Sequence, residues 1–259
     1  MRKILSKKWL PATLLVLAAM AVMIRLGIWQ LDRLENRRAF NDRVQAQLSQ
    51  PELELQGAAL DGPLAEMEYR SAFVTGEYDH SQQIALRNQY YNNQWGVHLV
   101  TPLKISGSDR AVLVDRGWIP AADYESGDWS QYDEVGLVTV QGVIRASRSK
   151  ADYGSQSDPT PVPGGPALRA WNFVNIPAIS QQTSLPLLPV YLQQSPTSAP
   201  IGLPVRTEVE LDLTEGPHMG YALQWFTFAA ILGIGYLVYL RRQDSRSAAR
   251  PEEEPNTVD

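Results

Sequence analysis

The chain has 259 residues, of which 44% are hydrophobic and 20% charged, with a formal net charge of −5 and no cysteine. Without cysteine there is no disulfide, no thiolate metal site and no cysteine nucleophile. Between Leu31 and Pro217 there are 14 Lys or Arg residues against 23 Asp or Glu residues, a difference of −9. Because phosphate binding needs a basic face, we expect no nucleic-acid partner.

The amino-terminal segment predicts a membrane span. Residues 1–8 hold four basic side chains, and residues 9–30 are apolar except for Arg25, which lies close enough to the far end of the span to snorkel toward water. The Ala-Met-Ala run at residues 19–21 also imitates the cleavage site of a signal peptide. Because the apolar run continues well beyond this site, we favour an uncleaved transmembrane helix.

The segment between the spans changes character at Pro51. Up to about Ser49 it is rich in Arg, Glu, Gln and Leu and lacks Gly and Pro, which predicts that the first helix continues out of the membrane. Beyond Pro51, short runs rich in β-branched and aromatic residues alternate with turn residues, which indicates a mostly antiparallel sheet that curls on itself. The expected strands are 69–78, 83–90, 96–105, 111–119, 137–146, 171–175, 190–194 and 206–211.

Composition also predicts segments without strands. Asp152–Pro166 is rich in Pro, Gly and Ser and should be a surface loop, as should Tyr124–Glu134. Residues 177–183 should form a short helix. The tail at 250–259, in which three glutamates lie between prolines, should be disordered.

Residues 219–240 predict a second span. The segment has 22 residues and no charge, and at ~1.5 Å per residue it reaches roughly 33 Å, enough for a hydrocarbon core of about 30 Å. Tyrosine and tryptophan lie near its ends as in an aromatic belt, and Arg241 and Arg242 follow it. Ala229 and Gly233 form a pair of small residues one turn apart that would let the two spans pack closely.

The basic residues assign an orientation. Four arginines follow the second span closely, whereas only Arg206 lies in the twenty residues before it, so we expect the tail 241–259 in the cytoplasm. With two spans, residues 1–8 are then cytoplasmic and residues 31–217 form an extracytoplasmic domain. Four arginines just after the first span conflict with this assignment, but long domains translocate largely regardless of charge.

These features predict the fold class and location together. We expect a membrane protein of the α+β type, with two transmembrane helices flanking a β-rich extracytoplasmic domain. The expected location is the inner membrane of a bacterium, as a multi-pass protein.

Few residues carry recognisable chemistry. The three histidines, His80, His98 and His218, make no metal-binding spacing, and the sequence has no Gly-rich phosphate loop and no nucleophile elbow. We expect His80 and His98 to occupy ordinary surface or strand positions.

His218 differs because it lies at the outer mouth of the second span. It falls on one helical face with Tyr221, Ala222 and Trp225. An imidazole above such an aromatic face could ligate the iron of a flat apolar macrocycle. On spacing alone the plainer interpretation is favoured, in which an interfacial histidine is hydrogen-bonded to lipid head groups or water.

Four segments, in order along the chain, resemble the Surfeit locus protein 1 family, which assists the assembly of cytochrome c oxidase. LGIWQLDR at 26–33 is similar to the exit of that family's first span. Arg87-Asn88, followed by GVHLVTPL at 96–103, is similar to its first paired strands. VLVDRGWIP at 112–120 resembles its most recognisable motif, and HMGYALQWF at 218–226 resembles the entrance of its second span.

This resemblance implies a role, without enzymatic turnover, in delivering haem a to the oxidase's catalytic subunit or retaining it there. The implied iron ligand is His218, with Tyr221 and Trp225 beside the haem. The implied partners are the catalytic subunit, its assembly machinery and membrane lipid. Residues expected to serve partner contacts or structure are Trp29, Gln30 and Arg33, on one face at the outer membrane surface, and Arg87, Arg116, Gly117 and Trp118.

Other interpretations are compatible with the sequence. A Gly at a strand end and a Trp in a core need no ligand, so the Arg-Gly-Trp segment can be purely structural. The whole chain can be a structural membrane chaperone that docks on the oxidase subunit and contacts no haem. An extracytoplasmic sensor or hydrolase on two anchors is disfavoured, because we find neither an output domain nor a nucleophile constellation.

Overall fold

The computed structural model describes residues 9–150, 158, 161, 165–197 and 202–248. The chain divides into two compact units, a helical unit of Met1–Asp42 with Leu213–Asp259 and a barrel unit of Arg43–Asp212. Residues 1–8, the tail 250–259 and most of the expected loop Asp152–Pro166 lie outside the described residues.

Two long helices dominate the helical unit. α1 runs from Leu10 to Leu48 and α4 from His218 to Ala248. Each contains a stretch long and apolar enough to cross a membrane, by length and composition. The predicted continuation of the first helix beyond its apolar stretch is confirmed. The helix ends at Leu48, shortly before Pro51, because proline disfavours the helical conformation in the residue that precedes it.

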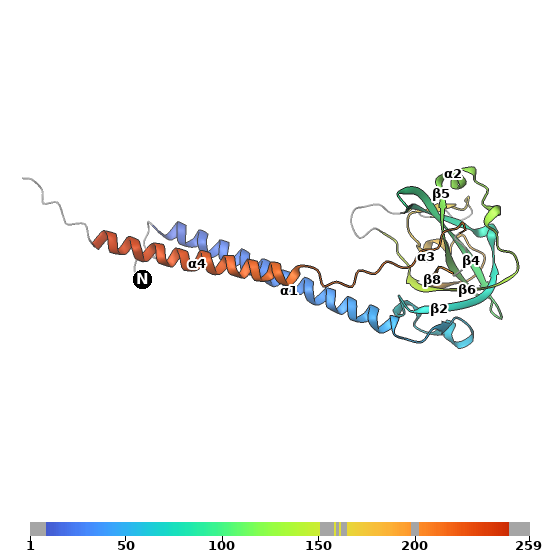
Figure 1. Cartoon of the computed structure of the whole chain (residues 1–259), viewed down its shortest axis with the longest axis horizontal. Helices are drawn as coiled ribbons and strands as arrows, with labels where there is room; N and C mark the ends of the chain where they lie inside the picture. The colour runs from blue at the N-terminus through green and yellow to red at the C-terminus, as the bar shows by residue number, and fades with distance from the viewer. Residues whose placement is uncertain (1–8, 151–157, 159–160, 162–164, 198–201, 249–259) are drawn as a thin grey trace, which may run out of the picture. The chain divides into compact units, whose positions relative to one another are not determined.

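α1 and α4 lie side by side and run in opposite directions (Figure 1). Five α1 residues that are buried or that contact the returning chain recur at every seventh position, the spacing of a left-handed coiled-coil seam. They are Thr13, Met20, Gly27, Leu34 and Asn41.

Small residues allow the two helices to approach. A Cβ atom added at Gly27 would lie 2.6 Å from the ring of Phe226, and one added at Gly233 would lie 2.8 Å from the Met20 side chain. Ala229 is also buried. The prediction that the small residues of the second span mediate its packing against the first is therefore confirmed.

Two of the arginines that follow the first span have partners within the helical unit. Arg38 forms a two-pronged ion pair with Glu215, at 2.8 and 2.9 Å. Arg37 Nε donates to the carbonyl oxygen of Thr214 at 2.9 Å. These contacts give the arginines a role in holding the chain that enters α4, so their presence here has a structural reason.

The barrel unit contains one eight-stranded sheet that closes on itself. β2 pairs with β6 on one side and with β4 on the other, so that β2, β6, β8, β5 and β4 form a ring from which β3 and β7 extend. Pairing is antiparallel except between β1 and β2, β3 and β7, and β5 and β8. The predicted sheet that curls on itself is therefore confirmed. The strands are β1 (Leu53–Glu54), β2 (Ser71–Tyr78), β3 (Ile84–Tyr91), β4 (Gln94–Ile105), β5 (Ala111–Pro120), β6 (Leu137–Ala146), β7 (Ala170–Trp171) and β8 (Leu187–Gln194).

Alternate residues of the ring strands fill the barrel, as the two-residue period of a strand requires. A second cluster covers part of the outer face, where Trp171 and α3 (Ile176–Ile179) pack near Leu113. α3 is shorter than the predicted helix at 177–183. The interior cluster includes residues from every ring strand, among them Val74, Val140, Leu192, Val114 and Leu103.

The predicted strand at 171–175 is wrong beyond Trp171. The backbone N–H groups of Asn172 and Phe173 donate to the carboxylate of Asp158, at 2.6 and 3.0 Å. Because these donors bond to a side chain, the segment leaves the ladder after two residues.

The predicted strand at 206–211 is also wrong. Only Val205 makes a bridge, to Trp118, and the residues after it form no ladder in the described part of the chain. Half-buried and exposed positions do alternate from Glu208 onward, but alternation alone gives a strand no partner.

The predicted loop at Tyr124–Glu134 is partly helical. It overlaps α2 (Ala121–Ser126), which ends at Gly127 in the left-handed conformation with φ of 73°. Trp129 and Tyr132 are buried against the barrel. Two aromatic anchors therefore hold a segment whose polar composition suggested a solvent-exposed loop.

Candidate functional site

The first set of candidate residues lies where α4 begins. Gly216 has a positive φ of 69°, and His218 is the first residue of the helix. The backbone N–H of Tyr221 donates to the carbonyl of Pro217 at 3.1 Å and closes the first turn. Proline suits this place because its missing N–H has no helical partner anyway. The imidazole is thereby fixed at the end of the apolar helix.

The His218 side chain is half-buried and contacts α1. Its Nδ1 lies 2.8 Å from Oε1 of Gln30. A carboxamide oxygen can only accept a hydrogen bond, so Nδ1 is the donor. In a neutral imidazole the other nitrogen, Nε2, then keeps its lone pair.

The face predicted for His218 and three neighbours is split in the structure. Ala222 is buried, whereas Tyr221 is 48% exposed. Trp225 is half-buried, with its ring 6.2 Å from that of Phe228 and perpendicular to it. The two aromatic residues thus flank the packed side of the helix, next to His218, and Ala222 belongs to the packed side itself.

The structure does not place the three residues predicted on one face of the first helix, Trp29, Gln30 and Arg33, on a common face. Trp29 and Arg33 are exposed, and as residues four apart they occupy one face of α1. Gln30 instead turns toward α4, where it meets His218.

In the described part of the chain, no three His, Asp or Glu side chains are arranged to hold a metal ion.

The second set of candidate residues lies in the barrel, around Arg116. This β5 side chain follows Val112 and Val114 on the inward face and is 0% exposed. Its Nη1 donates to Gln83 Oε1 at 2.9 Å, and its Nη2 donates to the carbonyl oxygen of Tyr132 and to Glu134 Oε1, the latter at 3.1 Å.

An aromatic ring and a second arginine complete this network. The Arg116 guanidinium lies 4.8 Å from the centre of the Tyr78 ring. Burial raises the pKa of the Tyr78 phenol above its usual range. Glu134 also accepts from Arg206 Nη2 at 3.1 Å, so one carboxylate serves two arginines.

Gly117 and Trp118 join β5 to the segment that leads toward α4. Gly117 has φ of 117°, and a Cβ atom there would lie 2.4 Å from the carbonyl oxygen of Val205. Trp118 and Val205 exchange two backbone hydrogen bonds of 2.8 Å. Only glycine allows the two backbones to come this close. The Arg-Gly-Trp segment therefore has a structural role within the barrel, because it holds Val205 against β5.

Arg87 has a local contact in the same unit. It is half-buried, and its Nη2 donates to the carbonyl oxygen of Ala170 at 3.0 Å. Arg87 thereby ties β3 to β7, and Asn88 beside it has a positive φ of 62°, at the irregularity in the pairing of β3 with β4.

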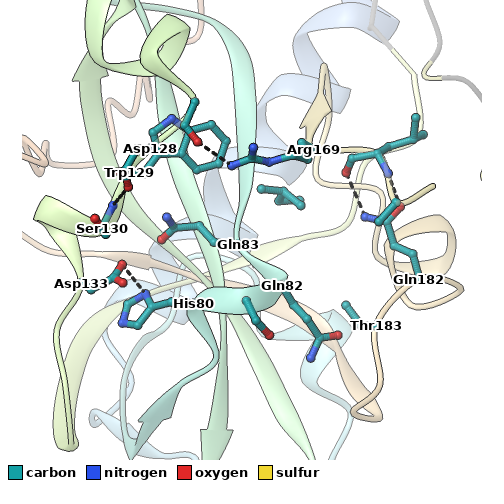
Figure 2. A pocket seen from close by; sticks show the side chains of 15 residues that line it. His80, Gln82, Gln83, Asp128, Trp129, Ser130, Asp133, Arg169, Gln182 and Thr183 are labelled. Atoms are coloured by element: carbon teal, nitrogen blue, oxygen red, sulfur yellow. Dashed lines mark hydrogen bonds and ion pairs between the residues drawn. The ribbon is translucent and has the colours of Figure 1, made fainter.

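A cavity of about 440 Å³ lies beside the Arg116 network (Figure 2). Gln83, which is 8% exposed, lines this cavity with the same side chain that accepts from Arg116. His80 also lines it, and Arg169 stacks 4.5 Å from the ring of Trp129. Sequence reasoning missed Gln83, because a glutamine at the start of a strand carries no pattern of its own.

His98 belongs to a buried pair that sequence reasoning also missed. Its Nδ1 lies 2.9 Å from both carboxylate oxygens of Asp115, and the N–H of Gly117 donates to the same carboxylate at 3.1 Å. Burial tends to lower the pKa of His98, but the charge of Asp115 and its hydrogen bond outweigh burial and raise it. The pairing follows from the register of β4 on β5, which residue spacing does not reveal.

The site residues therefore form two sets, one in each unit. The helical set contains His218, Gln30, Tyr221 and Trp225, and the barrel set is centred on Arg116. The first offers an imidazole nitrogen for a ligand. In the second, the groups described above are engaged with one another inside the protein.

Comparison with known proteins gives consistent matches. A SURF1-like protein of Caenorhabditis briggsae is 21% identical over 92% of this chain and 78% of its own length. A SURF1-like protein of Rickettsia conorii is 27% identical over 88% of this chain and 90% of its own. Surfeit locus protein 1 of Rattus norvegicus is 20% identical over 81% of this chain and 69% of its own.

The model of the SURF1 family matches residues 17–230. This range holds more than half of each predicted span, 9–30 and 219–240, the whole barrel and every site residue discussed above. The chain therefore belongs to the SURF1 family, whose members are cytochrome oxidase assembly factors and not enzymes.

Proposed function

We propose that this chain helps haem a reach, or stay in, the catalytic subunit of a haem-copper oxidase, and that His218 holds the haem iron. The observation that carries the proposal is the contact of His218 Nδ1 with Gln30 at 2.8 Å. It leaves Nε2 with a lone pair at the end of a helix that is long and apolar enough to cross a membrane.

The residues around His218 fit such a group. Tyr221 and Trp225 offer aromatic surface beside the imidazole, and the helix beyond them is apolar. The chain has no cysteine, so a thiolate cannot compete for the iron. Haem a would supply an iron that accepts the imidazole lone pair, an apolar tail that prefers lipid and propionates that prefer water. A histidine at the start of an apolar helix would let the apolar tail lie in lipid while the propionates stay in water.

The proposed partners are the oxidase catalytic subunit, its assembly machinery and membrane lipid. We place the protein in a bacterial inner membrane, with both termini in the cytoplasm and the barrel outside. The basic residues after the second span support this orientation.

A docking chaperone that contacts no haem is the second candidate. It is favoured by exposed aromatic side chains on the β3–β4 hairpin, where Tyr90 is 70% and Trp95 38% exposed. Exposed aromatic residues are common anchors of protein interfaces.

Replacing His218 with alanine should abolish the haem Soret band of protein purified from cells that make haem a. The protein should stay in the membrane at normal level, because the imidazole is only half-buried and its loss leaves the α1–α4 seam intact. Optical spectra in detergent, normalised to protein, measure this. Met219→Ala is the control, since it removes an exposed neighbouring thioether and should keep the spectrum. A His218→Ala spectrum equal to wild type, or a wild type that never takes up haem a, would favour the docking chaperone.

The orientation has its own test. Alkaline phosphatase fused after Ser155 should be active, and the same enzyme fused after Arg242 inactive, because the enzyme folds only outside the cytoplasm. The reverse pattern would refute the proposed topology. Intact-mass measurement of the membrane-purified protein would show in addition whether the chain is cleaved near Ala21.

A further inference from the structure

The contact between Gln30 and His218 decides which imidazole nitrogen carries the proton. A neutral imidazole has one N–H and one lone pair, and the two tautomers differ little in energy when nothing holds them. Oε1 of Gln30 accepts from Nδ1 at 2.8 Å, so the proton is held on Nδ1. If Gln30 presented its NH2 group instead, the proton would move to Nε2 and block that nitrogen as a ligand.

The place of Gln30 on α1 suits this role. The two residues are 188 positions apart in sequence and meet only because α1 and α4 pack along the seam. One turn before Gln30, Gly27 lets the ring of Phe226 come close. The seam therefore sets the distance between the carboxamide and the imidazole.

We propose that Gln30 is the positioning residue of the His218 site, holding the imidazole with Nδ1 protonated and Nε2 free for haem iron. This inference rests on the proposed function. Gln30 acts only through His218, by orienting the ring and fixing its tautomer. Such partners of a metal-ligating histidine commonly change metal affinity by 10- to 100-fold when removed.

The choice of an amide over a carboxylate has a consequence for release. A carboxylate partner makes the imidazole more basic and strengthens its bond to the metal. A neutral carboxamide fixes the same tautomer with less polarisation. Gln30 thus suits a protein that must hold haem and then hand it on.

The test compares three variants of the full-length protein in detergent, titrated with haem a. Gln30→Met keeps the length of the side chain but removes the acceptor, and should weaken haem a binding by about 10- to 100-fold. Gln30→Glu keeps an acceptor for Nδ1–H, and should bind at least as tightly as wild type and release haem more slowly. Gln224→Met, the same change at an exposed position of α4, should leave binding unchanged.

A second measurement needs no haem. Nitrogen-15 NMR of histidine-labelled apoprotein at about pH 8, where a free imidazole is neutral, reports the tautomer of His218, assigned by comparison with His218→Ala. Wild type and Gln30→Glu should show the Nδ1–H form, and Gln30→Met a mixture of both forms. An Nδ1–H form and a haem affinity that both survive in Gln30→Met would overturn the proposal.

The two measurements fail separately. If wild type takes up no haem a, the proposed function fails, and the NMR spectra alone decide whether Gln30 sets the tautomer. If wild type binds haem a through His218 but the spectrum shows Nε2–H in the apoprotein, the function stands and the role of Gln30 is wrong.

Discussion

Arg116→Ala should lower the thermal unfolding midpoint of the barrel by roughly 10 °C, which corresponds to a loss of about 3–5 kcal/mol in the free energy of unfolding. The side chain is 0% exposed, so its removal leaves a cavity within the barrel. It also leaves the carbonyl oxygen of Tyr132 without its charged donor. Relief from burying the cation offsets part of this cost.

Two further variants separate the causes. Arg116→Lys keeps the charge but reaches fewer of the acceptors that the guanidinium bonds, so it should recover less than half of the lost stability. Arg110→Ala is the matched control, because Arg110 is partly exposed and pairs with Asp61 at 2.8 Å, and it should cost no more than about 1 kcal/mol. Tryptophan fluorescence of purified protein during heating measures all three. If Arg116→Ala unfolds within 2 °C or so of wild type, the network does not stabilise the barrel.

Gly117→Ala should lower the free energy of unfolding of the barrel by about 3 kcal/mol or more, nearly as much as Arg116→Ala. Backbone strain of about 1–3 kcal/mol adds to a steric clash at this position. The added methyl would lie 2.4 Å from the Val205 carbonyl oxygen, at φ of 117°. The backbone has to shift, and the two hydrogen bonds between Trp118 and Val205 would be weakened or lost.

Gly107→Ala is the control that isolates the clash. Gly107 also has a positive φ, of 74°, but a Cβ atom there meets nothing within 4 Å. It should therefore cost only the strain of the left-handed conformation, roughly 1 kcal/mol. Chemical denaturation of both variants measures the two losses in the free energy of unfolding, provided that the dependence of this free energy on denaturant concentration has the same slope in both. Equal losses at the two glycines would show that the approach of Val205 is not what requires glycine at 117.

Much of the fold was predictable because its signals are local. β6 has the predicted bounds, Leu137–Ala146, since alternating side chains and flanking turn residues lie within the strand itself. The two long apolar helices were predictable for the same reason, because length and lack of charge are visible without knowledge of neighbours. The prediction of a strand at 206–211 was wrong because the alternating pattern is visible in the segment itself, whereas a strand also needs a neighbouring strand to pair with, which the segment does not reveal.

Some residues of the two candidate sites could be named from sequence motifs, but the contacts between them could not be predicted. The resemblance placed His218, Gln30 and Arg116 in motifs, but nothing in spacing brings Gln30 to His218, which lies in another helix. Gln83 and Asp115 were missed altogether, because a buried amide and a strand carboxylate acquire meaning only through the register of the sheet. Pairings across a closed barrel depend on the whole chain at once.

The closure of the barrel also decides when it can fold. β8 joins β5 to β6 in the ring, so these two strands lack a partner along one edge, and the ring cannot close, until Leu187–Gln194 is available. Contacts between residues this distant in sequence form slowly, because the chain must first be brought together at an entropic cost. During synthesis β5 and β6 therefore each keep one unpaired edge until β8 has been made, shortly before α4. Until the ring closes, these unpaired strand edges are exposed, and exposed strand edges make a chain prone to aggregation.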